Sequence, residues 1–547
     1  MPGRIFSFTL VPMIHSYCRI FSFGILLSFL ALSACVHQDK KQPAVKTDTV
    51  SSKNQSIKGN FSDQQDLHFD SVLIRSFSLE FPLLKSYSAD LSQFYAYRNF
   101  RYAWYNKNGL VEQASNLLDR LNNLDQEGIQ AAVPYRDVLD SLLNDPMPAT
   151  GPDPHVEILL TAEYFFYADK VWNGISETKT TKLEWFLPRK KLNLPYMMDS
   201  LLNDTAASLF SASYSFRQYN LLKTELLKYR HLDSTGSWTL FNSGLKKLKK
   251  QDSSEMISEI RHRLYLLGDL AKDSRSNIFD DSLEAAVKSF QQRNGIFPDG
   301  VMGDGFIREI NIPLREKISK LIINMERTRW IPINLSQRYI IINIPAFTLY
   351  AYDQDSLNFT MNVVVGKDVH KTVVFSGDIK YIVFSPYWNV PPSIMKNEIL
   401  PAIRKNPEYL KKNNMEWNGN SIRQKPGPAN SLGLVKFLFP NSYNIYLHDS
   451  PAKSLFGSQS RAFSHGCIRL AEPKKLTEYL LKDEGSWDVD KINAAMHAGK
   501  EKYVTLKNPV PVFIGYLTAW VDGQGRLNFR KDIYNRDQPL EELLIQK

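Results

Sequence analysis

The chain has 547 residues, which is too long for one ordinary core, so we expect about three folded units. Its composition, 43% hydrophobic and 23% charged, is that of a globular protein and excludes a chain disordered throughout. The formal charge of +10 comes from 67 Lys and Arg against 57 Asp and Glu, which are scattered rather than gathered in long basic runs. This balance suits an anionic partner such as a wall polymer, without identifying one, and we expect no nucleic-acid partner.

Residues 1–35 predict an export signal. An apolar run over residues 20–32 follows sparse positive charge, and it is too short for a comfortable membrane span. The run ends in Leu32-Ser33-Ala34-Cys35, which resembles a bacterial lipobox, in which the cysteine is lipidated and becomes the mature N-terminus. An ordinary cleaved signal and an uncleaved anchor are the alternatives, and a second start at Met13 stays open.

The chain has three cysteines, Cys18, Cys35 and Cys467. If the signal is removed and Cys35 is acylated, Cys467 has no partner within its own chain. A free thiol in an exported protein invites oxidation, so a buried structural cysteine competes with a reactive one. The polar residues 36–66 predict a flexible tether, and we expect a lipoprotein on the periplasmic side of the cell envelope, attached to a membrane.

Residues 67–250 predict a helical scaffold domain. Apolar residues recur at helical spacing between Leu110 and Leu124, and Gly128 is a plausible stop. Aromatic residues are dense here, which fits either a sugar-stacking surface or a helical core. A helical core is the more common reason for aromatic residues at such spacing.

Residues 251–313 predict three short helices separated by turns: Met256 to Leu267, Asp281 to Asn294, and Asp304 to Ile310. The stretch from Ala286-Val287 to Phe290-Gln291 leads into Gly295, Asp299-Gly300 and Gly303. This order of residues resembles the three-helix peptidoglycan-binding module. The resemblance implies a glycan partner without showing that this copy binds one.

A linking helix from about Arg315 to Arg329, in a linking segment of residues 314–338, precedes a change in the spacing of the apolar residues. Residues 339–515 are rich in β-branched and aromatic residues between turn formers, which predicts a β-rich domain. An insertion over residues 391–433 is predicted to be helical at first and loop-like at its end, and residues 516–547 form a C-terminal extension. The expected strands are Tyr339 to Tyr352, Phe359 to Val365, Thr372 to Phe375, Tyr381 to Phe384, Leu434 to Leu438, Asn444 to Leu447 and Val510 to Trp520.

Two short runs in this domain carry the candidate chemistry: Ile445 to Ser450, and Arg461 to Leu470. Cysteine reacts as the thiolate and needs a nearby base or positive charge. His448 lies at the end of an expected strand, and the side chain of His465 points the same way as that of Cys467 on an extended segment.

Gly466 lets the backbone approach a substrate closely, and the amides of Gly466 and Cys467 are expected to face an oxyanion. The alternative is a core histidine and a small hydrophobic cysteine. The contiguous His-Gly-Cys run, with an upstream histidine and no disulfide partner, favours catalysis.

At these residues the sequence resembles the L,D-transpeptidase family, whose signature is an upstream His followed by Ser/Thr-His-Gly-Cys. Further segments resemble the large, scaffold-bearing branch of that family: Trp388 to Ile394, Pro426 to Gly433 and Phe437 to Asn441. The resemblance implies a multidomain α+β chain: a helical scaffold, a three-helix wall-binding-like module, and a β-sandwich-like catalytic domain with a helical capping insertion.

The resemblance also implies the reaction and the role of each residue. A tetrapeptide stem of peptidoglycan acylates the cysteine with loss of D-Ala, and an amine on a second stem takes over the acyl group in a three-to-three cross-link. Cys467 would be the nucleophile and His448 the base, with the Asp449 backbone orienting His448. His465, Gly466 and Cys467 would form the oxyanion region, and Arg469 would support the loop. The residues that would bind substrate or line the groove are Tyr446, Trp388, Asn430, Arg461 and Ser464.

Three other interpretations stay open at this point. A thiol-dependent peptidoglycan hydrolase or carboxypeptidase would use the same cysteine, because water can release an acyl-enzyme as an amine does. A zinc site of His448, His465 and Cys467 lacks an evident fourth ligand, and we expect no cofactor. A non-enzymatic wall-binding lipoprotein would make the Ser-His-Gly-Cys run accidental. The resemblance further implies carbapenems as covalent inhibitors.

Overall fold

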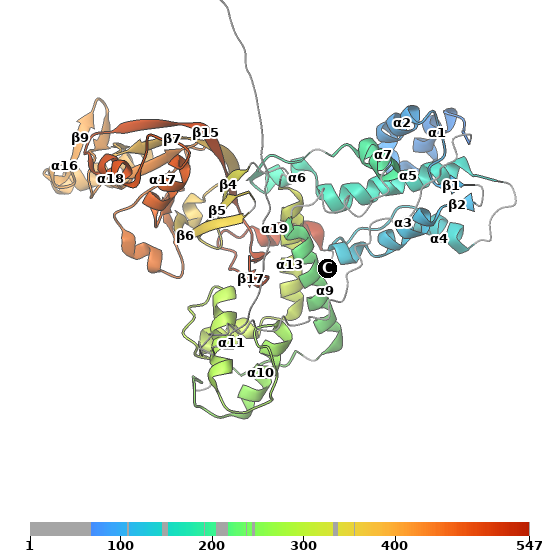
Figure 1. Cartoon of the computed structure of the whole chain (residues 1–547), viewed down its shortest axis with the longest axis horizontal. Coiled ribbons are helices and arrows are strands. Elements are labelled where there is room, and N and C mark those ends of the chain that lie inside the picture. Colours follow the sequence, from blue (N-terminus) through green and yellow to red (C-terminus); the bar gives the residue numbers. More distant parts are fainter. Residues whose placement is uncertain are drawn as a thin grey trace, which may run out of the picture. The chain divides into compact units, whose positions relative to one another are not determined.

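The structure is a computed structural model that describes residues 67–106, 109–144, 151–190, 192–203, 217–236, 238–242, 247–331, 337–354 and 356–545 (Figure 1). The expected signal, lipobox and tether lie outside these residues. Within the described ranges, every helix is too short or too polar to cross a membrane.

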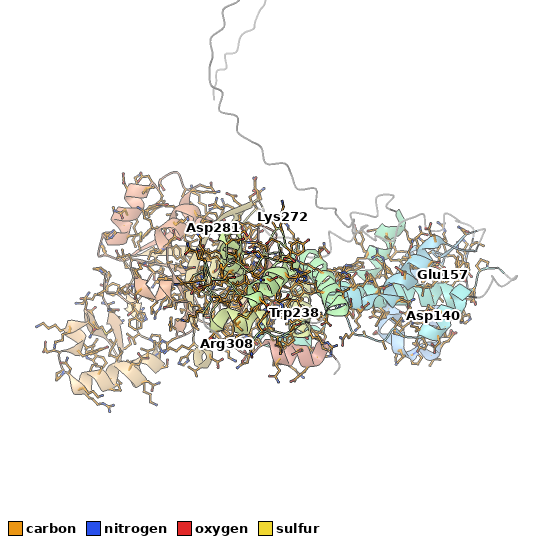
Figure 2. The ribbon with its side chains drawn as sticks, turned by 90° about the horizontal axis from the view of Figure 1, so that it is seen from below. Asp140, Glu157, Trp238, Lys272, Asp281 and Arg308 are labelled. Atoms are coloured by element: carbon orange, nitrogen blue, oxygen red, sulfur yellow. The ribbon has the colours of Figure 1, made fainter. Side chains whose placement is uncertain are left out.

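The first part of the chain is helical and has an aromatic core, as the spacing predicts. One buried carboxylate fixes its centre: Glu157, labelled in Figure 2, accepts hydrogen bonds from the amides of Ala103 (2.6 Å) and Trp104 (3.0 Å) and from the Tyr95 hydroxyl (2.9 Å). Burial raises the pKa of Glu157 to about 7 against these bonds. The elements are α1 (Val72–Glu80), η1 (Pro82–Tyr87), α2 (Ser88–Tyr97), β1 (Tyr105–Asn106), β2 (Gly109–Leu110), α3 (Glu112–Asn122), η2 (Leu124–Glu127), α4 (Arg136–Asn144), α5 (Pro154–Ala168), η3 (Asp169–Asn173), α6 (Glu177–Lys182), β3 (Trp185–Phe186), α7 (Leu194–Asn203) and α9 (Arg217–Thr235).

A three-helix module follows, made of α10 (Glu255–Leu267), α11 (Asp281–Arg293) and α12 (Asp304–Ile310). Its turn explains the sequence pattern. Gln291 donates to the Asp299 carboxylate (2.7 Å) and accepts from the Gly300 amide (2.9 Å), and Gly300 has a φ of +75°. The glutamine of the pattern therefore holds the Asp-Gly turn against its own helix.

Helix α13 (Leu314–Arg329) joins the helical parts to the sheet and lies beside α9 (Figure 1). Its C-terminal turn is buried and charged. Glu326 accepts from the Ile175 amide (2.7 Å) and pairs with Arg329 (2.7 Å), whose guanidinium also donates to the Glu127 carbonyl (2.6 Å). The buried charges are thus satisfied by partners from both the scaffold and the helix itself.

The strand-rich domain is built on one sheet whose path closes on itself, because β11 (Val435–Leu438) pairs with both β12 (Leu447–His448) and β7 (Val374–Phe384). This closure gives the β-sandwich-like domain a continuous sheet instead of two separate ones. Between them the path runs through β14 (Ile468–Leu470), β6 (Ser356–Gly366), β5 (Thr348–Asp353), β4 (Arg338–Asn343) and β15 (Lys502–Gly515). Helices α17 (Pro473–Leu481) and α18 (Val489–His497) pack on this sheet (Figure 1).

Several expected strands of this domain need correction, and the expected strand from Tyr339 to Tyr352 is two antiparallel strands, β4 and β5. The spans around Thr372 and Tyr381 form one strand, β7, and the last long strand begins at Lys502 instead of Val510. Pro509 and Pro511 suggest a loop, but Pro509 lies within a register shift of β15 and Pro511, opposite Asp378, follows directly after it, where the ladder tolerates missing amide donors.

The insertion, which we call the cap (residues 391–433), begins with the expected helical turns: α14 (Pro392–Ile394), η5 (Met395–Ile399), α15 (Leu400–Lys405) and α16 (Tyr409–Lys412). Its end is not simply a loop. β9 (Met415–Asn418) and β10 (Ser421–Gln424) form a hairpin, and β10 also pairs with β8 (Trp388–Asn389). The Gly419-Asn420 turn between the paired residues Asn418 and Ser421 was the signal for this hairpin, and Gly419 has a φ of +60°.

Residues after β15 fold back towards α13. They form the hairpin of β16 (Ala519–Val521) and β17 (Leu527–Phe529), followed by α19 (Asp537–Leu544). The expected strand to Trp520 is therefore two strands, separated by Tyr516, Leu517 and Thr518.

Candidate active site

The candidate residues meet where two short strands run side by side. β12 and β14 are parallel, with Leu447 opposite Ile468 and His448 opposite Arg469. The Ile468 amide donates to the Tyr446 carbonyl at 3.2 Å, which brings Cys467, one residue before β14, next to Tyr446. The rings of Tyr446 and His448 lie 5.7 Å apart.

His448 is buried and has one defined ring orientation. Its Nδ1 lies 2.5 Å from the Asp449 carbonyl oxygen, which only accepts hydrogen bonds, so Nδ1 carries the proton and Nε2 keeps a free lone pair. Burial, and then the charge of Arg469, lowers the pKa of His448 to about 3. The imidazole is therefore neutral near pH 7 and can accept a proton at Nε2.

The side chain of Asp449 fixes the turn that follows His448. Its carboxylate accepts from the amides of Leu434 (2.9 Å) and Ser450 (2.7 Å) and pairs with Lys453 (2.6 Å). Gly433, at the end of the cap, has a φ of +63°, and a Cβ there would lie 2.3 Å from the Asp449 carboxylate. Glycine is required at this position for both reasons.

Cys467 is half-buried and its thiol donates to the Asn444 carbonyl at 3.6 Å. Burial raises the pKa of Cys467, while hydrogen bonds from the Tyr446 backbone and side chain and the charge of Arg469 act in the opposite direction. Burial and Cys467 together raise the pKa of the Tyr446 phenol. The raised pKa of Cys467 and the lowered pKa of His448 both favour a neutral thiol and a neutral imidazole in the resting site.

The loop before Cys467 is stabilised by hydrogen bonds of its own Ser464 hydroxyl. Gly466 has a φ of +111°, and its amide donates to Ser464 Oγ at 3.2 Å; the same hydroxyl donates to the Cys467 carbonyl at 2.5 Å. The Gly466 amide, which we expected at the oxyanion, therefore faces Ser464. The Cys467 amide has no hydrogen-bond partner among the described residues.

The side chain of His465 contacts the cap and His370. It is exposed, its Nε2 lies 3.1 Å from Glu398 Oε1 of the cap, and its ring centroid is 5.1 Å from that of His370. These contacts link the loop to the cap. Sequence reasoning missed Glu398 and His370, because neither is near the motif along the chain.

Three of the weaker candidates, Asn430, Arg461 and Trp388, have structural contacts that explain their positions. Asn430 is fully buried and donates to three backbone carbonyls, the shortest of them that of Lys425 at 2.9 Å, so it closes the base of the cap and does not line a groove. Arg461 donates to the carbonyls of Ser458 and Phe347, both at 3.1 Å, and so braces the loop. Trp388 packs half-buried against the cap's own core.

Arg469 lies beside the site, because it is opposite His448 in the pairing of β12 and β14. Its charge interacts with that of Cys467. Across the described ranges, no group of three or more His, Cys, Asp or Glu side chains could hold a metal ion.

Three segments of the chain match known domain families. Residues 337–511 match the L,D-transpeptidase catalytic domain, residues 89–226 a scaffold domain, and residues 253–309 a family described as "Putative peptidoglycan binding domain". The chain therefore carries a scaffold domain, a peptidoglycan-binding domain and, C-terminal to both, an L,D-transpeptidase catalytic domain. The resemblance noted from the sequence is confirmed.

One similar protein is a "Putative L,D-transpeptidase" of Haemophilus influenzae, 30% identical over 242 residues. The match covers 40% of this chain and 48% of the relative, so the chain spans about half the length of this curated relative.

Among solved structures, the L,D-transpeptidase of Xylanimonas cellulosilytica (residues 123–326) is 14% identical over 50% of this chain and 100% of its own, with a TM-score of 0.19. L,D-transpeptidase 3 from Mycobacterium tuberculosis, in complex with a faropenem-derived adduct, is 14% identical over 32% of this chain and 60% of its own, with a TM-score of 0.17. These scores are too low to support a fold argument, so the resemblance rests on the sequence matches.

Proposed function

We propose that this chain is an L,D-transpeptidase of the cell envelope that uses the Cys467 thiol as its nucleophile and a peptidoglycan tetrapeptide stem as its acyl donor. The match of residues 337–511 supports the class of reaction. The observation that carries the assignment of residues is the meeting of Cys467, Tyr446 and His448 at the ends of two paired strands.

In the acylation step, the sulfur attacks the carbonyl carbon that precedes the terminal D-Ala. His448 Nε2 takes the thiol proton, because its other nitrogen is committed to Asp449 and the negative charge that forms on the sulfur counteracts the burial that lowers the pKa of His448. The Tyr446 hydroxyl stabilises negative charge on the sulfur, and the Cys467 amide donates to the oxyanion. The C–N bond breaks, D-Ala leaves with the proton from His448, and a thioester remains.

In the transfer step, the amine of a second stem attacks the thioester. His448 accepts a proton from this amine, the C–S bond breaks, and the proton returns to the sulfur. The product is a three-to-three cross-link. A strained β-lactam carbonyl would enter the same acylation step, so we also propose carbapenems as covalent inhibitors.

The rest of the chain would bring the enzyme to its polymer. The three-helix module matched at residues 253–309 would bind the wall, and a lipid on Cys35 would attach the chain to a membrane on the periplasmic side.

The direct test is incubation of the full chain with a disaccharide tetrapeptide, followed by mass analysis of protein and products. The proposal expects an acyl adduct on Cys467, free D-Ala and a cross-linked dimer. Release of D-Ala with tripeptide alone would mean that water is the acceptor and the enzyme a carboxypeptidase. Full product formation by Cys467→Ala would overturn the assignment of the nucleophile.

A further inference from the structure

A buried tyrosine from the C-terminal segment lies directly under the turn that supports the Cys467 loop. The Tyr534 hydroxyl donates to the Gly366 carbonyl at 2.6 Å and accepts from the Thr372 amide at 3.2 Å. Tyr534 is 1% exposed, so both bonds are shielded from water. A phenol with two backbone partners holds both ends of the turn between β6 and β7.

Thr372 passes this support on to the Cys467 loop. Its Oγ1 accepts from the Gly366 amide at 2.9 Å and donates to the Gly466 carbonyl at 2.8 Å. Thr372 is fully buried, so its hydroxyl cannot replace either of these two hydrogen bonds by one to water. The turn itself is tight, since a Cβ on Gly366 would lie 2.0 Å from the His370 carbonyl oxygen.

The Gly466 carbonyl and the Cys467 amide belong to one planar, trans peptide unit, in which C=O and N–H point in opposite directions. A hydrogen bond that fixes the carbonyl therefore also fixes the direction of the N–H group. Gly466 adopts a φ of +111° and has no side chain to hold it, so the orientation of this peptide depends on its hydrogen bonds.

We propose that Thr372, held by Tyr534, is a positioning residue that aims the Cys467 amide at the oxyanion formed on the acyl donor. This inference rests on the proposed function, because it assigns a purpose to the amide that the acylation step requires. The Cys467 amide is also the one that has no partner among the described residues, whereas the Gly466 amide is committed to Ser464.

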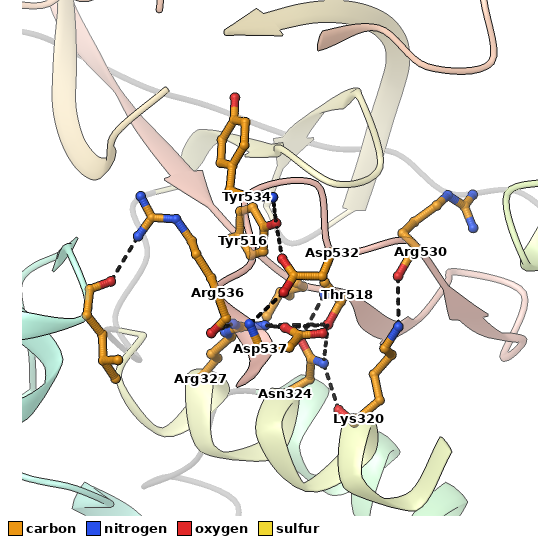
Figure 3. Close-up of polar contacts among 12 residues, drawn as sticks. Lys320, Asn324, Arg327, Tyr516, Thr518, Arg530, Asp532, Tyr534, Arg536 and Asp537 are labelled. Atoms are coloured by element: carbon orange, nitrogen blue, oxygen red, sulfur yellow. Dashed lines mark hydrogen bonds and ion pairs between the residues drawn. The ribbon is translucent and has the colours of Figure 1, made fainter. Parts of the chain in front are cut away.

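Figure 3 shows that the support continues to the linking helix. The Tyr534 amide donates to the Tyr516 hydroxyl at 2.9 Å, and that hydroxyl donates to the Asp532 carboxylate. Asp532 accepts from the Asp537 amide at 2.7 Å, and the Asp537 side chain pairs with Arg327 of α13 at 2.6 Å. Tyr516, Asp537 and Arg327 are buried and Asp532 is half-buried, so this chain of bonds ties Tyr534 to α13.

Two reactions of the same sulfur separate positioning from general support. Iodoacetamide alkylates a thiol at a saturated carbon and forms no oxyanion, whereas a carbapenem acylates the thiol through a carbonyl that does. A residue that aims the amide affects the acylation rate only. A residue that merely keeps the domain folded affects both rates or neither.

The test compares Thr372→Val, which removes the hydroxyl at nearly constant volume, with Thr372→Ser, which keeps it. Both rates are read by mass at the Cys467 peptide of the full chain. We expect Thr372→Val to slow carbapenem acylation by about 10- to 100-fold with alkylation unchanged, because small misplacement of an oxyanion donor has effects of this size. Thr372→Ser should restore acylation, and Tyr534→Phe should show the same split to a smaller extent.

Thr477→Val is the matched control. Thr477 is equally buried, and its hydroxyl donates to the Pro473 carbonyl at 2.9 Å within α17, so this variant should leave both rates unchanged. The inference would be overturned if Thr372→Val were acylated at the wild-type rate, or if its acylation and alkylation rates fell equally. In both cases the proposed function would still stand as long as Cys467→Ala formed no carbapenem adduct. Acylation that persists in Cys467→Ala would instead overturn the proposed function, and the inference with it.

Discussion

At the scale of single residues, the two histidines of the motif have different surroundings. His448 is buried, neutral and oriented by the Asp449 carbonyl, whereas His465 is exposed and contacts Glu398 of the cap. This difference follows from the strand pairing, because only His448 lies on a strand that runs beside β14.

We therefore expect His448→Ala to lower turnover by about 100-fold or more, which is typical for loss of a general base. His465→Ala keeps the base and should lower turnover much less. The measurement is the rate of D-Ala release from a tetrapeptide at neutral pH by the two variants. Equal, small losses in both would show that neither histidine is the base.

The low pKa of His448 also makes stability depend on pH. Its pKa is about 3 in the folded protein against an ordinary value of 6.5, so between these values the unfolded chain binds the extra proton. The free energy of unfolding should therefore fall as pH falls below 6.5, by at most about 1.4 kcal/mol per pH unit from this group.

Denaturant titrations at several pH values measure this slope. His448→Gln removes the titrating group while keeping a polar side chain, and its free energy of unfolding should depend less on pH between 4 and 6.5. A slope identical to that of the wild type would show that His448 is not responsible.

At the scale of elements, the cap reaches the Cys467 loop through the pair of Glu398 and His465. Both side chains are well exposed, so the pair itself contributes at most about 1 kcal/mol, and Glu398→Gln should slow acylation by no more than about fivefold.

Replacing residues 395–424 with a short Gly-Ser linker should slow carbapenem acylation more strongly, because a cap that covers the groove excludes water and steadies the adduct. Iodoacetamide should still label Cys467 in this variant. Acylation at the wild-type rate without the cap would show that the cap takes no part in the reaction.

The elements that sequence could predict are those with a local pattern. The helices of the three-helix module and α13 begin and end within a few residues of the expected bounds, since capping and turn residues lie beside them in the chain. The β9–β10 hairpin and the start of β15 were missed, the first because its alternation is short and polar, the second because of its prolines.

The candidate site divides in the same way. Cys467, His448 and the backbone of Asp449 are recognisable because they lie in two short runs of sequence. Thr372 and Tyr534 are separated by 162 residues, and each looks like an ordinary strand or tail residue. Their contact exists only because the C-terminal segment folds back towards the sheet.

At the scale of the whole molecule, α13 connects the parts that the family matches separate. Its buried residues contact the scaffold through Glu127 and Ile175 and the C-terminal segment through Asp537. Such contacts between buried charged groups are costly to break singly, so we expect the described domains to unfold together.

The attachment of the whole chain to a membrane stays a prediction, because Cys35 lies outside the described residues. If Cys35 carries lipid, the mature protein should fractionate with membranes, and Cys35→Ala should not. A Cys35→Ala protein that remains in the membrane fraction would contradict the predicted lipid anchor.

The central claim, that Cys467 is the nucleophile of an acyl-transfer reaction, is tested most directly by intact-protein mass spectrometry with a carbapenem. The wild-type protein should gain the mass of one carbapenem, and Cys467→Ala should gain none while unfolding at the same denaturant concentration as the wild type. An adduct on Cys467→Ala, or none on a folded wild-type protein, would contradict the mechanism.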